Sequence, residues 1–148
     1  MPSETDLAWA AGIIDGEGCI TITRAGGQLR VMVANTDLRM LHKLRELFGG
    51  NISRKKTYRA HYKPQWFWQL CAKDAAGALN AMLPYLVTKA DQAELGLLSR
   101  RYIGRVGIRG SNDKAALDAL ACRVRDLKHV TDELPPLVIP EEKQQWLI

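Results

Sequence analysis

Two carboxylates and two glycines stand together near the N-terminus, in the segment Asp15-Gly16-Glu17-Gly18. An acidic side chain between glycines at the end of a helix is a poor core residue and a good ligand for a hard cation such as Mg²⁺. The glycines keep the backbone thin, so the Glu17 carboxylate and a nearby carbonyl could both approach a metal and a phosphate. Taken alone, an acid in such a place is more often simply solvated, so its surroundings must decide.

Basic residues gather in two stretches of the chain. The sequence has no acid between Glu46 and Asp74, where the basic residues are Arg54, Lys55, Lys56, Arg59, Lys63 and Lys73. Interleaved with them are the aromatic residues Tyr58, Tyr62, Trp66, Phe67 and Trp68, and a second basic cluster comprises Arg100, Arg101, Arg105 and Arg109. With a net charge of +5, this pattern permits a polyanionic partner. Charge alone is equally compatible with a solvated basic face.

The first expected element is a short helix over residues 7–15, capped by Ser3 or Thr5. Gly16 and Gly18 are expected to end it, because glycine can adopt the left-handed conformation that closes a helix. One stripe of this helix is formed by small residues that would let another backbone approach closely, namely Ala8, Ala11 and Gly12.

Two β-hairpins separated by helices follow. Residues 19–23 and 28–33 alternate apolar and polar side chains around a glycine turn, and a leucine-rich helix ends at Gly49-Gly50. A second hairpin uses residues 51–56 and 65–72, and helices follow from residue 73, from residue 89 and after Ser111 or Asn112. Hairpins between helices predict an α+β fold, in which helices cover one face of an antiparallel sheet and the other face stays open. The expected inner residues of the first hairpin are Ile20, Ile22, Leu29, Val31 and Val33.

The segment from Ala10 to Gly18 (AAGIIDGEG) resembles the LAGLIDADG motif of homing endonucleases. Later landmarks follow in the family's order: Leu47-Phe48-Gly49-Gly50, a tryptophan-containing strand, Pro84-Tyr85-Leu86, Lys89, and Gln92-Ala93-Glu94. The resemblance spans about residues 7 to 100. It departs from the motif where Ala10 replaces the first leucine and Glu17 replaces the commoner aspartate.

The resemblance implies a site-specific DNA endonuclease that uses Mg²⁺, with Mn²⁺ as a substitute. Glu17 occupies the motif position that binds the metal, Gly16 could add its carbonyl, and Asp15 is a lesser candidate ligand that more simply supports the helix end. Lys89 matches a basic residue near the scissile phosphate, although a surface lysine at a helix start is the alternative. Two further catalytic candidates are Asn35, where family members often carry glutamine, and Arg39.

The resemblance also implies an αββαββα fold with a saddle-like sheet over residues 1–104, and residues 105–148 as a C-terminal helical extension and tail of the same domain. Single-motif members act as homodimers on near-palindromic sites, and each protomer cuts one strand to leave 3′ overhangs. Ala8, Ala11 and Gly12 would pair two motif helices at the dimer interface. Double-stranded DNA is the expected partner, with intron RNA as an additional one.

Strand parity predicts which side chains face the open side of the sheet, where a major groove could be read. The base-reading candidates are Thr21, Thr23, Gln28, Arg30, Asn51, Ser53, Lys55 and Gln69, and the phosphate-binding candidates are Arg24, Arg54, Lys56, Arg59 and Lys63. Trp66, Trp68 and Leu70 share the opposite parity and are expected in the core. A slip of one residue would exchange the two faces.

Other features restrict the class of protein. No stretch approaches the roughly 20 apolar residues of a membrane-spanning helix, and the polar N-terminus lacks the pattern of a signal peptide, so we expect an intracellular protein, cytoplasmic or nucleoid-associated. The widely spaced Cys19, Cys71 and Cys122 are expected to be reduced, mostly buried thiols. Two rival functions stay open: a LAGLIDADG-type protein that binds DNA or RNA without cleaving it, such as an intron maturase or regulator, and a basic scaffold that binds nucleic acid by charge alone.

Overall fold

The computed structural model of the chain describes residues 1–56, 61, 63–104, 110, 112–129 and 134–140. Its elements are α1 (Glu4–Glu17), β1 (Gly18–Ile22), β2 (Leu29–Asn35), α2 (Leu38–Phe48), β3 (Asn51–Lys55), β4 (Gln65–Cys71), α3 (Ala72–Met82), η1 (Leu83–Tyr85), α4 (Ala90–Ser99), η2 (Arg100–Tyr102) and α5 (Lys114–Leu127). The predicted α+β class and the αββαββα order are therefore confirmed. None of the helices in this part of the chain combines the length and apolar character that crossing a membrane requires.

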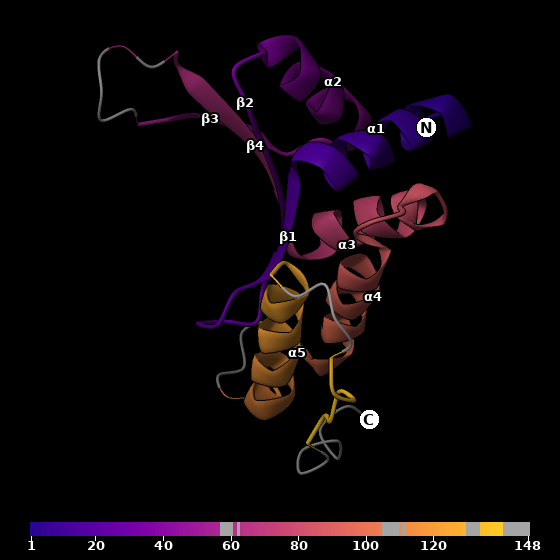
Figure 1. The fold of residues 1–148 in the computed structure, drawn as a ribbon, viewed down its shortest axis with the longest axis vertical. Coiled ribbons are helices and arrows are strands. Elements are labelled where there is room, and N and C mark those ends of the chain that lie inside the picture. Colours follow the sequence, from indigo (N-terminus) through magenta and orange to yellow (C-terminus); the bar gives the residue numbers. More distant parts are fainter. Residues whose placement is uncertain (57–60, 62, 105–109, 111, 130–133, 141–148) are drawn as a thin grey trace.

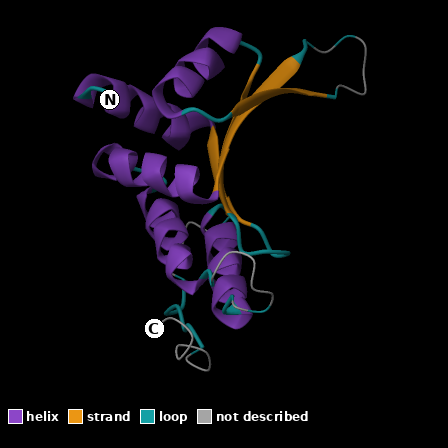
Figure 2. Ribbon diagram, turned by 180° about the vertical axis from the view of Figure 1, so that it is seen from behind, coloured by secondary structure: helices purple, strands orange, loops and turns teal. Residues whose placement is uncertain are grey.

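The four strands form one antiparallel sheet in the order β1-β2-β4-β3. Helices α1 to α4 lie on one side of it, and α5 lies at the β1 end of the sheet (Figure 1). Seen from behind, the sheet curves so that the face turned away from the helices is concave (Figure 2). The sheet thus has one packed face and one open, concave face, as expected.

The packed face carries the residues that parity assigned to it. At most 3% of the surface of each of these side chains is exposed: Ile20, Ile22, Leu29, Val31, Val33, Trp68 and Leu70. The indole nitrogen of Trp68 donates to the Gly49 carbonyl at 2.7 Å, which satisfies its polar atom inside the core. Trp66 is only half-buried, and the Arg54 guanidinium lies 5.9 Å from its ring centroid.

The predicted cap of helix α1 at Ser3 is confirmed, but the helix starts three residues before and ends two residues after the expected span of residues 7–15. Ser3 is the N-cap and forms a capping box with Asp6. The helix continues to Glu17, so Gly16 lies inside it, and Gly18 is extended (φ −85°) and not left-handed. The reason is that the chain passes from α1 into the paired strand β1 without a turn. Gly18 is required for space, since a Cβ there would lie 2.7 Å from the Ile14 carbonyl oxygen.

Replacing Gly18 with alanine is expected to destabilise the fold by about 1–3 kcal/mol, the usual cost of overpacking. The matched control is Gly77→Ala in α3, where a Cβ would meet nothing within 4 Å. That change should be neutral or stabilising by roughly 0.5–1 kcal/mol, because alanine loses less backbone entropy in a helix. Urea unfolding of both variants measures the difference. Equal stabilities of the two variants would show that the backbone between α1 and β1 can shift to accommodate the added Cβ.

The start of α5 also differs from the prediction. Its N-cap is Asp113, whose carboxylate accepts from the Ala116 amide at 3.2 Å. Asn112 instead accepts the Gly104 amide at 2.7 Å, and Ser111 lies outside the described residues. The helix packs on β1 and α4 and so covers the edge strand of the sheet. Its buried stripe is Ala116, Leu117, Leu120, Ala121 and Val124.

Candidate functional site

The end of α1 is joined to the start of α4 by the carboxylate of Asp15. One oxygen (Oδ2) accepts the Val87 amide at 2.9 Å, and the other (Oδ1) accepts the Lys89 amide at 3.0 Å and the Thr88 hydroxyl at 3.1 Å. The first amides of a helix lack partners within the helix. Asp15 therefore holds the loop that leads into α4, and the predicted supporting role for it agrees with these contacts.

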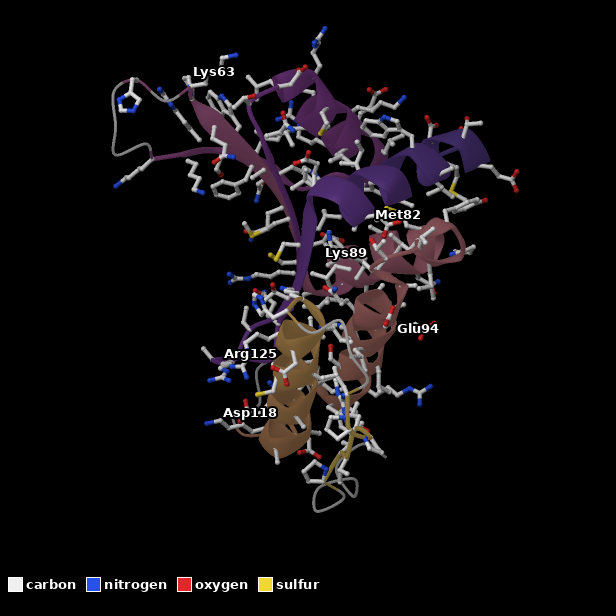
Figure 3. The ribbon with its side chains drawn as sticks, in the orientation of Figure 1. Lys63, Met82, Lys89, Glu94, Asp118 and Arg125 are labelled. Atoms are coloured by element: carbon white, nitrogen blue, oxygen red, sulfur yellow. The ribbon has the colours of Figure 1, made fainter. Side chains whose placement is uncertain are left out.

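The side chain of Lys89 forms a second connection, from the start of α4 to the backbone of α1. Its ammonium nitrogen (Nζ) donates to the carbonyls of Ile14 and Asp15, both at 2.9 Å. These carbonyls lie in the last turn of α1, where a positive charge is favourable. Lys89 is half-buried where α1, β1 and α4 meet (Figure 3). It is therefore not the free surface lysine that was the alternative.

Burial lowers the pKa of Lys89 below its ordinary value, while the charge of Asp15 opposes this. The Lys128 ammonium acts in the same direction as burial, and Glu17 acts against it. The charges of Lys128 and Glu17 therefore both act on the Lys89 ammonium. The acid and the two lysines come from α1, the start of α4 and the end of α5.

Glu17 is the last residue of α1 and is exposed. Among the described residues its carboxylate has no hydrogen-bond partner, and it interacts electrostatically with Lys89. This contrasts with Asp15, two residues earlier, whose oxygens already accept three hydrogen bonds. Of the two carboxylates, Glu17 is the one free to bind a ligand.

The oxygen donors at this helix end fit a hard divalent cation only in part. Glu17 and the carbonyl of the exposed Gly16 are suitable donors, but Asp15 is committed to α4 and does not fit the ligand role considered for it. The described residues contain no group of three or more acidic, histidine or cysteine side chains that could hold a metal. Mg²⁺ needs only one or two carboxylates when water and phosphate oxygens complete its shell. The set therefore fits Mg²⁺ held jointly with a phosphate.

The two other catalytic candidates are engaged elsewhere. The Asn35 amide oxygen accepts the Asp37 amide at 2.8 Å, and strand parity places Asn35 on the packed side with Val33. The Arg39 guanidinium pairs with Asp37 at 2.7 Å and holds the pKa of that carboxyl at about 2. Lys89 and Glu17 therefore share an electrostatic interaction, whereas the hydrogen bond of Asn35 and the ion pair of Arg39 are formed with Asp37.

The open face of the sheet is a grid fixed by the strand register. One row across the strands contains Cys19, Met32, Gln69 and Asn51, another Thr21, Arg30 and Cys71, and a third Ala34, Phe67 and Ser53. Lys55 continues this face beside Gln65. Thr23 and Gln28 close the β1–β2 hairpin through a 3.0 Å bond from the Gln28 amide to the Thr23 hydroxyl, and the Gln28 side chain accepts from Arg30, also at 3.0 Å. Hydrogen-bonding side chains thus surround a more apolar centre.

The basic residues that were expected to hold phosphates are spread around this face. Lys55, Lys56 and Lys63 are exposed near the β3–β4 hairpin (Figure 3 labels Lys63), whereas Arg54 lies against Trp66. At the other end, Arg24 donates to the Cys122 thiol of α5 at 3.4 Å. Arg59 lies outside the described residues.

The region also contains residues that had not been assigned to it, among them Cys19, Phe67 and Lys128. Cys19 and Phe67 could have been found by parity, since they alternate with Thr21 and Gln69. Lys128 had no sequence signal, because it follows a helix more than a hundred residues away. Its ammonium nitrogen donates to the Cys19 sulfur and to the Thr21 hydroxyl, both at 3.2 Å.

The cysteines are free, but the expectation of mostly buried thiols is wrong, because Cys19 is exposed and Cys71 and Cys122 are only half-buried. Burial raises the pKa of the Cys19 thiol, but the hydrogen bonds from Thr21 and Lys128 and the charges of Lys128 and Lys89 outweigh it. The pKa of this thiol therefore lies below its ordinary value. The open face thus carries an exposed thiol at the place where β1 leaves α1.

The small residues of α1 divide between two faces. Ala11 is fully buried in the protomer, whereas Ala8 and Gly12 are exposed. Because helical residues four apart lie on one side, Gly16 belongs to the exposed face and Ala11 does not. Val87, which Asp15 holds, is a large apolar residue with 78% exposure. The free face of α1 thus comprises Ala8, Gly12 and Gly16.

Comparisons with known proteins identify the fold. Models of known families do not match the sequence, and neither do curated proteins. Homing endonuclease I-CvuI in complex with its target in the presence of 2 mM Ca matches with a TM-score of 0.67 and 20% identity, over 97% of this chain and 92% of that chain. The same enzyme in complex with the I-CreI target, with the DNA not cleaved in the presence of 2 mM Mg, matches with a TM-score of 0.66 and 20% identity, over 97% of this chain and 93% of that chain.

An archaeal intron-encoded homing endonuclease, I-Vdi141I, complexed with DNA, also matches. Its TM-score is 0.63 at 16% identity, over 90% of this chain and 91% of that chain. At such identities the likeness is one of fold. The chain therefore has the architecture of these homing endonucleases over nearly its whole length.

Proposed function

We propose that this chain is a site-specific, metal-dependent DNA endonuclease of the LAGLIDADG homing type, active as a homodimer. The observation that carries the proposal is the exposed Glu17 carboxylate, which has no hydrogen-bond partner among the described residues and interacts electrostatically with the ammonium of Lys89. Glu17 and Lys89 lie where α1 meets the concave sheet, whose open face carries hydrogen-bonding side chains. The similar structures are homing endonucleases in complex with DNA, which supports duplex DNA as the ligand.

Glu17 and the Gly16 carbonyl would hold a divalent cation together with the scissile phosphate. When bound, Mg²⁺, or Mn²⁺ in its place, supplies an activated water and electrostatic stabilisation of the leaving oxygen. The chain's own contribution would be a fixed charge: Lys89 would face the same phosphate with an ammonium whose position is set by two main-chain carbonyls. Such a preset charge costs no reorganisation when negative charge develops. The presence of Mg and Ca in the similar complexes supports a divalent metal.

The concave face would lie along the major groove, where each base pair presents its own donors and acceptors. Gln69 and Asn51 are paired across β4 and β3, and Arg30 stands opposite Thr21, so both ends of the face offer donors and acceptors. Lys55, Lys56 and Lys63 at one end and Arg24 at the other would contact phosphates. We place the DNA-reading residues on this grid.

One chain carries one motif, so two copies are needed to cut both strands. The exposed face of α1, Ala8, Gly12 and Gly16, would pack against the same face of a second copy, with Val87 at its margin. This isologous contact would bring two Glu17 carboxylates together about a two-fold axis. Each protomer would then cut one strand of a near-palindromic site and leave 3′ overhangs.

Gly12→Gln should separate the copies while leaving each one folded. A Cβ at Gly12 meets nothing within 4 Å in the protomer, and glutamine is a better helix former than glycine. At the two-fold axis, however, both copies would place the larger glutamine side chain in the interface. Dimerisation should therefore weaken by about a hundredfold or more. Sedimentation equilibrium measures the dimer, and Gly77→Gln on the exposed side of α3 is the control. A variant that stays as dimeric as the control would remove α1 from the interface.

The test of the function is selection of cleaved sites from a randomised DNA library with Mg²⁺ and, in parallel, with EDTA. Discrete double-strand cuts at a near-palindromic site, present only with metal, support the proposal. Sequence-specific binding without cleavage in Mg²⁺ or Mn²⁺ would instead indicate a maturase or regulator. Binding without any sequence preference would leave only a basic scaffold.

A further inference from the structure

A groove of about 230 Å³ lies between β1 and α5, outside the Glu17–Lys89 pair. Its polar lining comes from Thr21, Thr23, Arg24, Arg125 and Lys128, and none of the described residues that line it is acidic. The threonines belong to the open face of the sheet, and the α5 residues come from one helix side. The label in Figure 3 shows Arg125 on α5 at the level of the β1–β2 hairpin. Three positive side chains therefore converge on one depression beside the sheet.

The partners of these cations within the protein are weak. Lys128 donates to a thiol and a hydroxyl, and Arg24 donates to the thiol of Cys122. Sulfur is a poor acceptor, so an ammonium or guanidinium held this way loses little when it turns to a stronger acceptor. Arg125 is the exception, since its guanidinium lies 3.5 Å from the Asp126 carboxylate in an exposed pair. The groove thus offers two cations without a carboxylate partner among the described residues.

Strand β1 connects the groove to the end of α1. Thr21 comes four residues after Glu17 in a chain that is extended from Gly18 onward, a distance of about 13 Å at roughly 3.3 Å per residue. One strand of duplex DNA carries a phosphate for about every 3.4 Å of helix axis. A strand whose scissile phosphate sits at Glu17 would therefore present a phosphate to the groove within roughly four nucleotides.

We propose that the β1–α5 groove binds the backbone of the cleaved DNA strand, and that Lys128 contacts a phosphate a few nucleotides from the scissile one. The proposal rests on the proposed function and adds a binding role for the C-terminal helix. In this role α5 does more than cover the edge of the sheet: it delivers a cation to the margin of the active site. Lys128 is then a positioning residue that sets how the strand enters.

The first experiment measures how DNA affinity depends on salt. With a random-sequence duplex, Lys128→Gln should lower the slope of log K against log salt by about 0.9 and weaken binding about three- to tenfold at physiological salt. Lys128→Arg should behave as wild type, because it keeps the charge. Lys114→Gln, the same change at an exposed position of the same helix, is the matched control and should leave the slope unaltered. Thermal melting checks that the variants fold alike.

The second experiment locates the phosphate. Single neutral methylphosphonates are placed along the strand of the selected site, and binding is compared between wild type and Lys128→Gln. At one position near the cut, the substitution should weaken wild type several-fold and leave the variant unaffected, because both changes remove the same contact. Additive losses at every position, or an unchanged salt slope, would overturn the groove assignment. Equal slope changes in Lys128→Gln and Lys114→Gln would also overturn it.

These outcomes are separable from failure of the proposed function. A chain that binds no DNA in any form contradicts both proposals. A chain that cleaves its selected site, and whose cleavage and salt slope ignore Lys128, contradicts only the role of the groove.

Discussion

Glu17→Gln is expected to abolish cleavage while DNA binding persists. The amide keeps the size of the side chain but loses the negative charge that would hold a divalent cation beside the phosphate. The single-turnover rate should fall about a thousandfold or more, equivalent to roughly 4 kcal/mol of transition-state stabilisation. Affinity measured in EDTA should be unchanged or improved, because a negative charge has been removed next to a phosphate.

The control for this variant is Glu94→Gln, the same chemical change at an exposed acid of α4. Its cleavage rate and affinity should match wild type. If Glu17→Gln still cleaves within tenfold of wild type, the carboxylate is not a metal ligand and the site must be sought elsewhere. If neither wild type nor variant cleaves and both bind the same sequences, the chain is a binding protein with an endonuclease fold.

Asp15→Ala is expected to affect both stability and catalysis. It leaves the amides of Val87 and Lys89 and the hydroxyl of Thr88 without the acceptor that now joins them to α1. Losing several hydrogen bonds to one charged group should cost about 2–4 kcal/mol of unfolding free energy. Because the same loop carries Lys89, the cleavage rate should also fall, about 10- to 100-fold, at temperatures where the variant is fully folded.

Two comparisons separate these effects. Asp91→Ala removes another acid from the first turn of α4 and should cost only about 0.3–1 kcal/mol, the size of a helix-dipole effect. Asp15→Asn keeps one acceptor oxygen and should fall between wild type and Asp15→Ala. A loss of cleavage without a change in Kd would show that the position of Lys89 has moved. A fully active, less stable Asp15→Ala variant would restrict Asp15 to a structural role.

Much of the fold could be predicted because it depends on local patterns. Alternation placed Ile20, Ile22 and Val31 on the packed face, and the cap at Ser3 followed from residue type. The helix end at Glu17 could not be predicted in the same way. Glycine usually signals a left-handed stop, but here Gly18 is needed for its missing Cβ, a tertiary fact about the Ile14 carbonyl.

The candidate site, like the fold, could be predicted only where local sequence patterns determine it. Glu17 and Lys89 were predicted from the motif and its landmarks, and in the structure they interact electrostatically. The role of Asp15 as a support was foreseen, but its three partners at Val87, Thr88 and Lys89 were not, because they depend on how α1 and α4 pack. Lys128 was missed altogether, since no local pattern links it to Cys19 and Thr21.

Strand β1 starts at the residue after Glu17 and ends in the hairpin that carries Arg24. The Glu17 carboxylate proposed to bind the metal and the first side chains proposed to face bases would therefore share one short, hydrogen-bonded segment with no hinge between them. If the concave face reads DNA as proposed, the offset between the recognised bases and the cut bond is fixed by the covalent chain. Substitutions at Arg30 or Gln69 would then redirect the protein to new sequences, and each new sequence would be cut at the same distance from its centre.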